Sequence, residues 1–381
     1  MESKEEQTIE PKIESTSPGM PKKKLLLIIL IPSIIVVIVV AVVVGVVVGT
    51  KKKDKKDDLI VNSYDNTAEL LEKFPIGNPT KVQTGIEAKI QNRLLTGFEN
   101  WNRGFDAWKA WGNILYTEDS IYNVHGARLT LAQYQDSMDV TLKRTNILMG
   151  DFHNMLICNE YAAIYYDITT IVGERKVPGT VMEFVVFKDY GDKLGTRVVE
   201  GWGGTNDTSY ASMASYQSED EKKYEDQQKK EILDADTELR NKLSAGTSYT
   251  YTIKYPTTYL ETYANTLINI IKSGFDAWNS GTISTYETWI NNNFDENALF
   301  LGLTKVNRTK SVYIEEMTAL FSKYDIKKVY FDNILIRDKW VAIHYRFTNT
   351  TGTEKTIGDR MEFFLFEGTD PNWKIKFNFL K

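Results

Sequence analysis

The sequence predicts an α+β protein built from two tandem copies of one domain, with a single apolar segment ahead of them. Three observations lead to this prediction. Several short segments recur in the second half of the chain, each recurring region starts with a helical pattern and ends in strand-like runs, and an uncharged stretch of 24 residues precedes both. A length of 381 residues suits about two domains. The hydrophobic content of 42% and the aromatic content of 12% are sufficient for two cores.

The internal repeat rests on four matched segments. The phrase Gly-Phe-Asp-Ala-Trp occurs at 104–108 and again at 274–278, a shift of 170 residues. Three later matches share a shift of 179: Tyr134 and Met138 with Tyr313 and Met317, 163–166 with 342–345, and 182–184 with 361–363. The two shifts predict about nine extra residues in the second copy, between Trp278 and Tyr313. Because this period is far too long for a solenoid, we interpret the repeat as two copies of a whole domain.

The N-terminal region is expected to attach the chain to a membrane. Residues 1–24 are polar and aperiodic, which is typical of a disordered tail. Residues 25–48 carry no charge and are flanked by lysines, so we expect an uncleaved transmembrane helix over 25–49. A charged spacer, later punctuated by Pro, Gly and Asn, occupies 50–85.

Lysines are nearly balanced on the two sides of this span, so charge alone does not set its orientation. We expect a single-pass arrangement with the tail in the cytosol and the domains on the outer or lumenal side. Asn206, Asn307 and Asn349 lie in sequons for N-glycosylation, which would be used only in that arrangement.

The first domain is expected at 86–205 and the second at 259–381. Each starts with apolar residues at three- and four-residue steps, from Ile90 to Trp108 and from Leu260 to Trp278. We therefore expect the repeated phrase to close the first helix of each copy. The second copy shows a further short helix around 286–290, which is missing or reduced in the first copy.

Strand-like runs make up the rest of each domain. They cover 155–172, 180–188 and 194–202 in the first copy, and 328–337, 340–348, 360–366 and 373–380 in the second. Met182 and Phe184 alternate with Val185 and Phe187, so both faces of the sheet are apolar and both should be covered. We expect helices on one face and the sister domain's sheet on the other, giving an intrachain pseudo-dimer. The linker 206–258 is expected to hold a charged helix over 217–244 and an edge strand over 248–255.

This order of elements resembles the nuclear-transport-factor-2-like (NTF2-like) superfamily, in its SnoaL-like polyketide-cyclase branch. The resemblance is carried by residues 276–281, Asp-Ala-Trp-Asn-Ser-Gly, then a short helix, then the strand-like 294–300, and later Met-Glu-Phe at 361–363. It implies two cone-shaped domains, each with about three helices packed on a strongly curved antiparallel sheet, and a pocket between helices and sheet.

Composition excludes several classes of function. The net charge of -5, without a basic stripe, argues against nucleic-acid binding. The chain has three histidines and no pair of them at metal-ligand spacing, so we expect no metal, and no cofactor-binding motif is present. The single cysteine, Cys158, lies in an apolar run and is expected to be a small buried hydrophobe.

The resemblance implies a pocket lined by the first strand and the long central strands. The candidate pocket residues are His125, Tyr165, Asp167 and Glu183 in the first copy, and His344, Arg346 and Glu362 in the second. Only the glutamate is shared, so the same chemistry cannot run in both copies. We expect a membrane-attached module that binds an apolar small molecule or a protein partner. The alternative is an isomerase, cyclase or dehydratase that uses acid–base catalysis in the first domain.

Overall fold

The computed structural model describes residues 64–78, 83–124, 127–143, 146–191, 195–203, 215–257, 259–302 and 307–380. All of them belong to one compact unit of the chain, 35–381. Within these ranges the strands form two seven-stranded sheets, one in each copy, and helices pack on both sheets, which gives an α+β fold of two domains.

The elements of the first domain run from 67 to 203. Its helices are α3 (Thr67–Lys73), α4 (Gly85–Asn102), α5 (Phe105–Leu115) and α6 (Leu131–Leu142). Its strands are β1 (Ile76–Asn78), β2 (Tyr116–Val124), β3 (Ala127–Thr130), β4 (Asn146–Cys158), β5 (Tyr161–Val172), β6 (Arg175–Asp189) and β7 (Thr196–Gly203).

The second domain follows a long connecting helix, α8 (Glu219–Ser244). Its own helices are α9 (Ala264–Asn279), α10 (Ile283–Asn293) and α11 (Lys310–Lys323). Its strands are β8 (Ile253–Tyr255), β9 (Phe294–Leu301), β10 (Asn307–Thr309), β11 (Asp325–Arg337), β12 (Trp340–Thr351), β13 (Glu354–Thr369) and β14 (Asn372–Leu380).

The two sheets have the same topology. The strand order is β1-β4-β5-β6-β7-β2-β3 in the first and β8-β11-β12-β13-β14-β9-β10 in the second. In both, the four long strands pair antiparallel, and the short strands β1 and β8 pair in parallel with the outermost of them. β1 and β8 both precede the positions, 86 and 259, at which the sequence suggests that the domains start.

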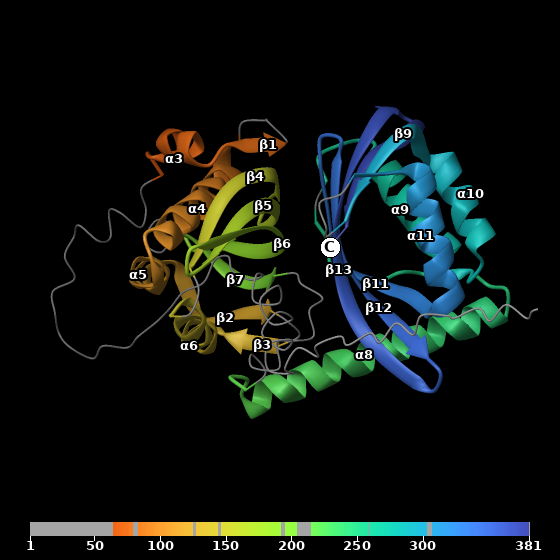
Figure 1. Ribbon diagram of the computed structural model, residues 1–381, viewed down its shortest axis with the longest axis horizontal. Coiled ribbons are helices and arrows are strands. Elements are labelled where there is room, and N and C mark those ends of the chain that lie inside the picture. The colour runs from red at the N-terminus through yellow and green to blue at the C-terminus, as the bar shows by residue number, and fades with distance from the viewer. Residues whose placement is uncertain are drawn as a thin grey trace, which may run out of the picture. The chain divides into compact units, whose positions relative to one another are not determined.

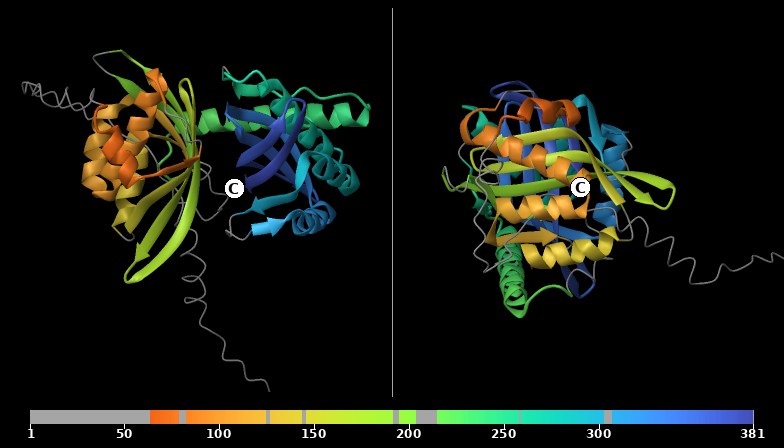
Figure 2. Two further views of the ribbon diagram at one scale, coloured as in Figure 1. Left: turned by 90° about the horizontal axis from the view of Figure 1, so that it is seen from above. Right: turned by 90° about the vertical axis from the view of Figure 1, so that its left-hand side faces the viewer.

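Each sheet carries its helices on one face, as Figure 1 shows for α4 to α6 on the first sheet and α9 to α11 on the second. In the right panel of Figure 2, α4 and α5 run across the strands of the first sheet. The space between helices and sheet holds the main core of each domain, centred on Phe98, Phe152 and Tyr166 in the first and on Phe275, Phe331 and Tyr345 in the second.

The register of the repeat predicted from Gly-Phe-Asp-Ala-Trp is wrong. In the first domain α4 ends at Asn102, and Phe105 begins a new helix, α5, so the phrase at 104–108 opens the second helix instead of closing the first. The second helix of the first domain is therefore present. The segment that corresponds to 274–281, Gly-Phe-Asp-Ala-Trp-Asn-Ser-Gly, is 97–104, Gly-Phe-Glu-Asn-Trp-Asn-Arg-Gly, at a shift of 177.

Matching contacts establish this register. Phe98 stacks on Phe152 with ring centroids 4.3 Å apart, and Phe275 stacks on Phe331 at 4.4 Å. The indole nitrogens of Trp101 and Trp278 donate to the carbonyl oxygens of Ile147 and Ile326, at 2.6 and 2.9 Å. The helix shift of 177 and the strand shift of 179 differ by two, so the nine-residue insertion expected in the second copy does not exist.

Two glycines explain why this segment recurs. Gly97 and Gly274 lie where an added Cβ would come within 2.9 Å of Trp111 and 2.5 Å of Trp289, so only glycine lets the second helix pack so closely on the first. Gly104 and Gly281 have positive φ, at 113° and 76°, where the chain turns from the first helix toward the second. The recurring pattern therefore encodes a helix–helix contact and a turn.

The strands agree with the predicted faces but not with all predicted lengths. The run 155–172 is two strands, because Asn159 adopts a left-handed φ of 54° and turns the chain between β4 and β5. Val185 and Phe187 belong to the helix-facing core, and Met182 and Phe184 belong to a different cluster on the opposite face. The alternation predicted from the sequence along this strand is confirmed.

That second cluster contains side chains from both sheets. Leu156, Tyr165 and Phe184 of the first copy share it with Leu335 and Phe363 of the second. Polar contacts accompany it. Arg337 forms an ion pair with Glu87 at 2.9 Å, and both side chains are almost fully buried. Cys158, 4% exposed, donates its thiol to the carbonyl oxygen of Ile336 at 3.2 Å, and its predicted burial is confirmed.

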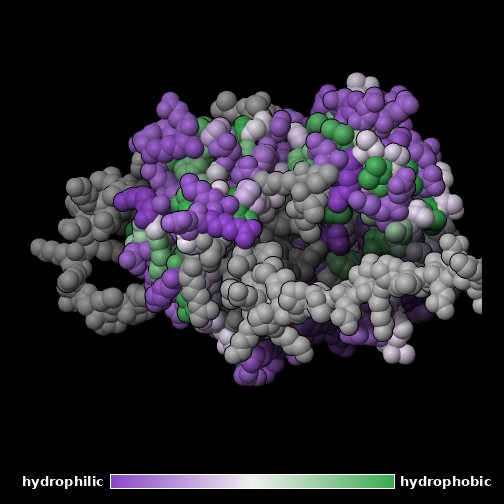
Figure 3. All heavy atoms as spheres, in the orientation of Figure 1, coloured by the Kyte–Doolittle hydropathy of each residue, from purple (hydrophilic) through white to green (hydrophobic). Residues whose placement is uncertain are grey.

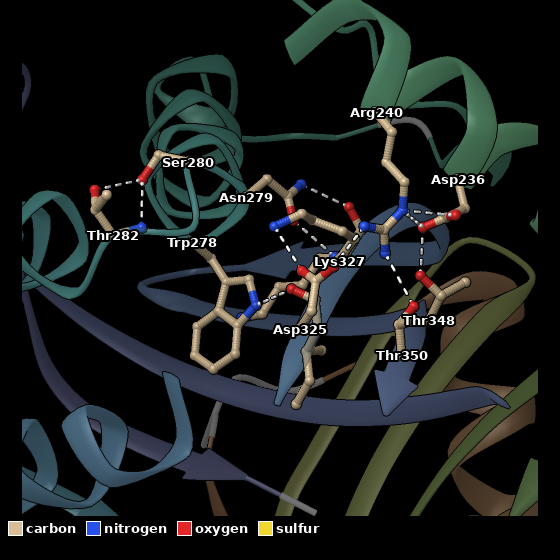
Figure 4. A network of polar contacts seen from close by, with 12 residues as sticks. Asp236, Arg240, Trp278, Asn279, Ser280, Thr282, Asp325, Lys327, Thr348 and Thr350 are labelled. Carbon is tan, nitrogen blue, oxygen red and sulfur yellow. Dashed lines mark hydrogen bonds and ion pairs between the residues drawn. The ribbon is translucent and has the colours of Figure 1, made fainter. Parts of the chain in front are cut away.

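The connecting helix α8 is fixed to the second sheet by a buried carboxylate. Asp236 is fully buried and accepts hydrogen bonds from Arg240, Thr348 and Lys355 at 2.5 to 3.0 Å. Figure 4 shows Arg240 extending from α8 to Asp236 and onward to Thr350, and it also forms an ion pair with Asp325 at 2.6 Å. Ile232 and Leu239, each 1% exposed, pack beside this network. Ile232 and Leu239 thus mark the face by which this charged helix docks on the second sheet.

The tail 1–24, the expected membrane span 25–49 and half of the spacer, 50–63 and 79–82, lie outside the described residues. None of the helices that the structure does describe is both long and apolar enough to cross a membrane. The described surface seen in Figure 3 is mainly hydrophilic, with small hydrophobic areas scattered over it.

Candidate functional site

The four candidate residues of the first domain do not share one face of the sheet. Glu183 lies on the helix side, where it accepts a hydrogen bond from the Tyr166 hydroxyl at 2.8 Å. Tyr165 lies on the opposite side, with its ring 4.6 Å from that of Phe379. Asp167, two residues further along the strand, shares the side of Tyr165 and pairs with His153 at 3.1 Å. His125 lies outside the described residues.

His344 and Arg346 of the second domain also lie away from the helix side. His344 is fully buried, with its Nε2 2.9 Å from Asp359 and its ring 5.8 Å from that of Trp202. Arg346 pairs with the buried Asp332 at 2.5 Å. Hydrogen bonding to His344 and the charge of Arg346 outweigh desolvation by burial and lower the pKa of Asp359 to about 2.

At the shift of 179, Asp332 and Arg346 correspond to His153 and Asp167. The two copies thus hold a pair of an acidic and a basic side chain at the same place, with the acidic residue on opposite strands. Such a swap preserves a side-chain contact between the strands, so we interpret these candidates as parts of strand-to-strand polar pairs.

The two shared glutamates do lie between helices and sheet, in equivalent settings. Glu362 accepts a hydrogen bond from the Tyr345 hydroxyl at 2.6 Å, as Glu183 does from Tyr166. Its second oxygen accepts from the Asn378 amide at 3.0 Å. Burial and the charge of Glu362 together raise the pKa of Tyr345, which therefore remains a hydrogen-bond donor at neutral pH.

A cavity opens beside Glu362 in the second domain. It has a volume of about 50 Å³ and is lined by aromatic and aliphatic side chains together with three charged ones, Lys328, Arg360 and Glu362. Trp278, Tyr313 and Tyr345 form its aromatic wall. A smaller adjoining space of about 20 Å³ shares Tyr313, Lys328 and Glu362 with it, so Lys328 borders both.

Lys328 is held in an unusual setting for a lysine. Its Nζ lies 4.7, 4.9 and 5.1 Å from the ring centroids of Trp278, Phe275 and Tyr345. Among the described residues this ammonium has neither an ion pair nor a hydrogen bond. Desolvation by burial lowers the pKa of Lys328 to about 8, although the nearby charge of Glu362 acts in the opposite direction.

The helix α9 positions this lysine through its last residue. The Asn279 side chain accepts from the Lys328 backbone N–H at 2.8 Å and donates to the Lys328 carbonyl oxygen at 2.8 Å. Asn102 holds Met149 in the same way in the first domain, at 2.7 and 2.9 Å. The scaffold is therefore common to both copies, and only the side chain that it presents differs.

The corresponding space in the first domain is occupied by side chains. Met149 stands in place of Lys328 and Val181 in place of Arg360. Gly201 stands in place of Asn378, and the Tyr122 ring fills the space that a Cβ at this position would need. Tyr122 stacks on Tyr134 with centroids 4.9 Å apart. The shared glutamate of this copy is therefore enclosed among tyrosines.

Lys328, Arg360 and Asn378 were not predicted from the sequence. The available signal was a comparison of the two copies at a shift of 179, which sets a lysine against a methionine at one inward position and an arginine against a valine at another. Within the described ranges, no group of three or more His, Cys, Asp or Glu side chains could hold a metal ion.

No protein-family model and no curated protein matches this chain. Its structure is similar to solved NTF2-like structures. An NTF2-like protein from Cytophaga hutchinsonii is 13% identical, with 32% of this chain and 98% of that protein covered and a TM-score of 0.26. A ketosteroid isomerase-like protein from Erwinia carotovora is 12% identical, with coverages of 32% and 96% and a TM-score of 0.26. A protein described as a SnoaL-like polyketide cyclase, from Jannaschia, is 11% identical, with coverages of 32% and 90% and a TM-score of 0.27.

Proposed function

We propose that this chain is a tandem NTF2-like module whose second domain binds a small carboxylate ligand, while the first domain serves as its structural partner. The observation that carries the proposal is the cavity beside Glu362, with two cations, Lys328 and Arg360, on its wall. Neither cation has an ion pair among the described residues. A charge held in a half-buried place without a partner favours a ligand of opposite charge.

The cavity also limits the size and shape of the ligand. A space of about 50 Å³ accommodates roughly three to five water-sized groups, since each needs about 10–15 Å³. The aromatic wall of Trp278 and Tyr313 suits a short apolar part, and Arg360 can hold a carboxylate through two parallel hydrogen bonds. Glu362 does not neutralise these cations fully, because it is one anion against two cations. A short aliphatic carboxylate such as propionate meets these requirements.

The first domain supports this role through the contact surface between the sheets. The buried pair Glu87–Arg337 and the shared cluster around Phe184 and Phe363 favour an intrachain pseudo-dimer. We further propose that the segment 25–49 anchors the module in a membrane with the domains on the outer or lumenal side. Of the two sequons that the structure describes, Asn307 is exposed at the start of β10 and is better placed for a glycan than Asn349, which is half-buried within a central strand.

Binding is tested on the purified full-length chain by titration calorimetry with propionate. We expect a dissociation constant in the millimolar range for a ligand of this size. Replacing the cations by their first-domain counterparts, Lys328→Met and Arg360→Val, should each weaken binding about tenfold to a hundredfold, because each removes a charge-assisted contact. The matched control is Lys327→Met, since Lys327 is the adjacent lysine and pairs with Asp325 at 3.0 Å. Unchanged affinity in both cavity variants would exclude this cavity as the site.

Membrane orientation is tested separately in cells. Treatment of the cell-made protein with a glycosidase should increase its electrophoretic mobility, and Asn307→Gln should remove most of that change. A cytosolic location of the second domain predicts no change for either protein. Fusing a cytosolic reporter to the C-terminus would distinguish that location from an unused sequon.

A further inference from the structure

We infer that Lys328 is a nucleophile that forms a reversible imine with the carbonyl carbon of a small aldehyde or 2-oxo acid in the cavity of the second domain. The inference deepens the proposed function, since it rests on the same cavity and adds a covalent step to it. The juxtaposition that points to it is an amine without a polar partner on the wall of a small aromatic cavity that also holds Arg360 and Glu362.

The amine is available to react because, among the described residues, no side chain forms a hydrogen bond or an ion pair with it. A lysine that forms an ion pair must break that pair before its nitrogen can attack, as Lys327 would have to leave Asp325. The Nζ of Lys328 lies against four aromatic rings, with centroids between 4.7 and 6.0 Å away, and forms no hydrogen bond or ion pair among the described residues.

The backbone of Lys328 is fixed, which favours a directed reaction. Asn279 holds both the N–H and the carbonyl oxygen of this residue, so β11 cannot slide relative to α9 at this point. Only the side-chain torsions remain to be ordered when a ligand enters. Preorganisation of this kind reduces the entropic cost of bringing two reacting groups together.

Protonation equilibria support the same conclusion. With the pKa of Lys328 lowered to about 8, about a tenth of the amine is neutral at pH 7. Only the neutral amine has the electron pair that attacks a carbonyl, and desolvated lysines are used in this way as nucleophiles. The surrounding rings favour the charged form, so burial and ring contacts act in opposite directions on this group.

The step balances without an oxidant or reductant. The nitrogen electron pair of neutral Lys328 forms a C–N bond, and the carbonyl oxygen takes up a proton to give a carbinolamine. Loss of the hydroxyl group as water, with the remaining proton of the nitrogen, leaves a C=N bond. One water is released for each imine, and the reverse reaction consumes it. In a 2-oxo acid, the carboxylate would face Arg360, which lines the same cavity.

The test is reductive trapping on the full-length protein with two probes, propanal and glyoxylate, each with sodium cyanoborohydride. Peptide mapping by mass spectrometry then measures modification at every lysine. We expect Lys328 to be modified at least tenfold faster than Lys327, and the rate at Lys328 to rise between pH 6 and about pH 8 and then level off. Glyoxylate should react faster than propanal because it carries the carboxylate. Excess propionate should slow both probes at Lys328 alone.

One variant separates this inference from the proposed function. Lys328→Arg keeps a cation but cannot form an imine, so it should keep propionate binding within a fewfold and lose trapping at this position. Trapping at Lys328 no faster than at Lys327, in a protein that binds propionate, would overturn the inference and leave the binding site intact. Fast trapping in a protein that does not bind propionate would support the imine and refute the carboxylate site.

Discussion

The buried carboxylate of α8 gives the most quantitative prediction. Asp236 accepts hydrogen bonds from two cations and a hydroxyl while being fully buried. Removing one partner of a buried ion pair typically costs about 3–5 kcal/mol. Here the side chains of Arg240 and Lys355 remain 29% and 32% exposed, so water can solvate both cations once the carboxylate is lost. We therefore expect Asp236→Asn to destabilise the docking of α8 by about 2–3 kcal/mol.

The assay is hydrogen–deuterium exchange of the α8 amides, which reports local opening without requiring the whole chain to unfold in one step. A cost of about 2–3 kcal/mol corresponds to exchange roughly 30- to 150-fold faster in the second half of α8. The control is Asp234→Asn on the same helix. Asp234 pairs with Lys230 on the surface, where such pairs contribute less than about 1 kcal/mol. Equal exchange in the two variants would refute the reasoning.

The pH dependence follows from the same contacts. Burial alone would raise the pKa of Asp236, but hydrogen bonds from Arg240, Lys355 and Thr348 hold it below its ordinary value of 3.8. A carboxyl whose pKa is lower in the folded state contributes stability that is present above its unfolded pKa and is lost as the pH falls through the folded pKa. Protection of α8 should therefore decrease below about pH 4 in the wild type, and much less in Asp236→Asn.

Three further predictions concern single positions. Burial raises the pKa of Cys158 to about 12, so its thiol should resist a soluble disulfide reagent at neutral pH and react fully in denaturant. Gly274→Ala should lower the free energy of unfolding by about 1–3 kcal/mol, because the new Cβ would come within 2.5 Å of the Trp289 ring. Gly97→Ala, whose Cβ would lie 2.9 Å from Trp111, should cost less. A larger loss of stability for Gly97→Ala in thermal unfolding would contradict this steric account. The native pKa of Lys328, about 8, lies below its ordinary 10.5, so the unfolded chain binds more protons between these values and stability rises with pH there. Lys328→Met should remove that rise and stabilise the protein at pH 7 by about 1–3 kcal/mol, as measured by urea unfolding.

The sequence predicted best those elements whose structure depends on a single local pattern. Alternation along 182–187 predicts both faces of β6, because the pairing of these residues with β5 is regular. The charged helix over 217–244 agrees with α8 to within two residues, since Ser218 and Glu221 form a capping box at its start. These features depend on local chemistry that a single chain displays.

The inward position of Lys328 could not be read from alternation. Two irregularities in pairing, between Lys328 and Tyr330 and between Phe331 and Asn333, shift the phase of β11 twice. The alternation of apolar and polar residues therefore does not show which of the adjacent lysines, Lys327 or Lys328, points toward the helices. The phrase at 104–108 misled for a different reason. The match of 104–108 with 274–278 is identical over five residues, whereas the structurally correct match of 97–104 with 274–281 is longer but not identical. Within the phrase, helix packing requires only the glycine, the phenylalanine and the tryptophan, so the other two positions differ between the copies.

The early strands β1 and β8 have a practical consequence for producing pieces of this protein. Each is only three residues long, yet each closes one edge of its sheet by pairing with β4 or β11. A fragment that started at the first long helix of either domain, at 85 or 264, would lose that strand and expose the backbone of a 13-residue neighbour. Long uncovered edges recruit other strands and promote aggregation. To keep these edges covered, a fragment should therefore begin upstream of Thr67 for the first domain and upstream of Glu219 for the second.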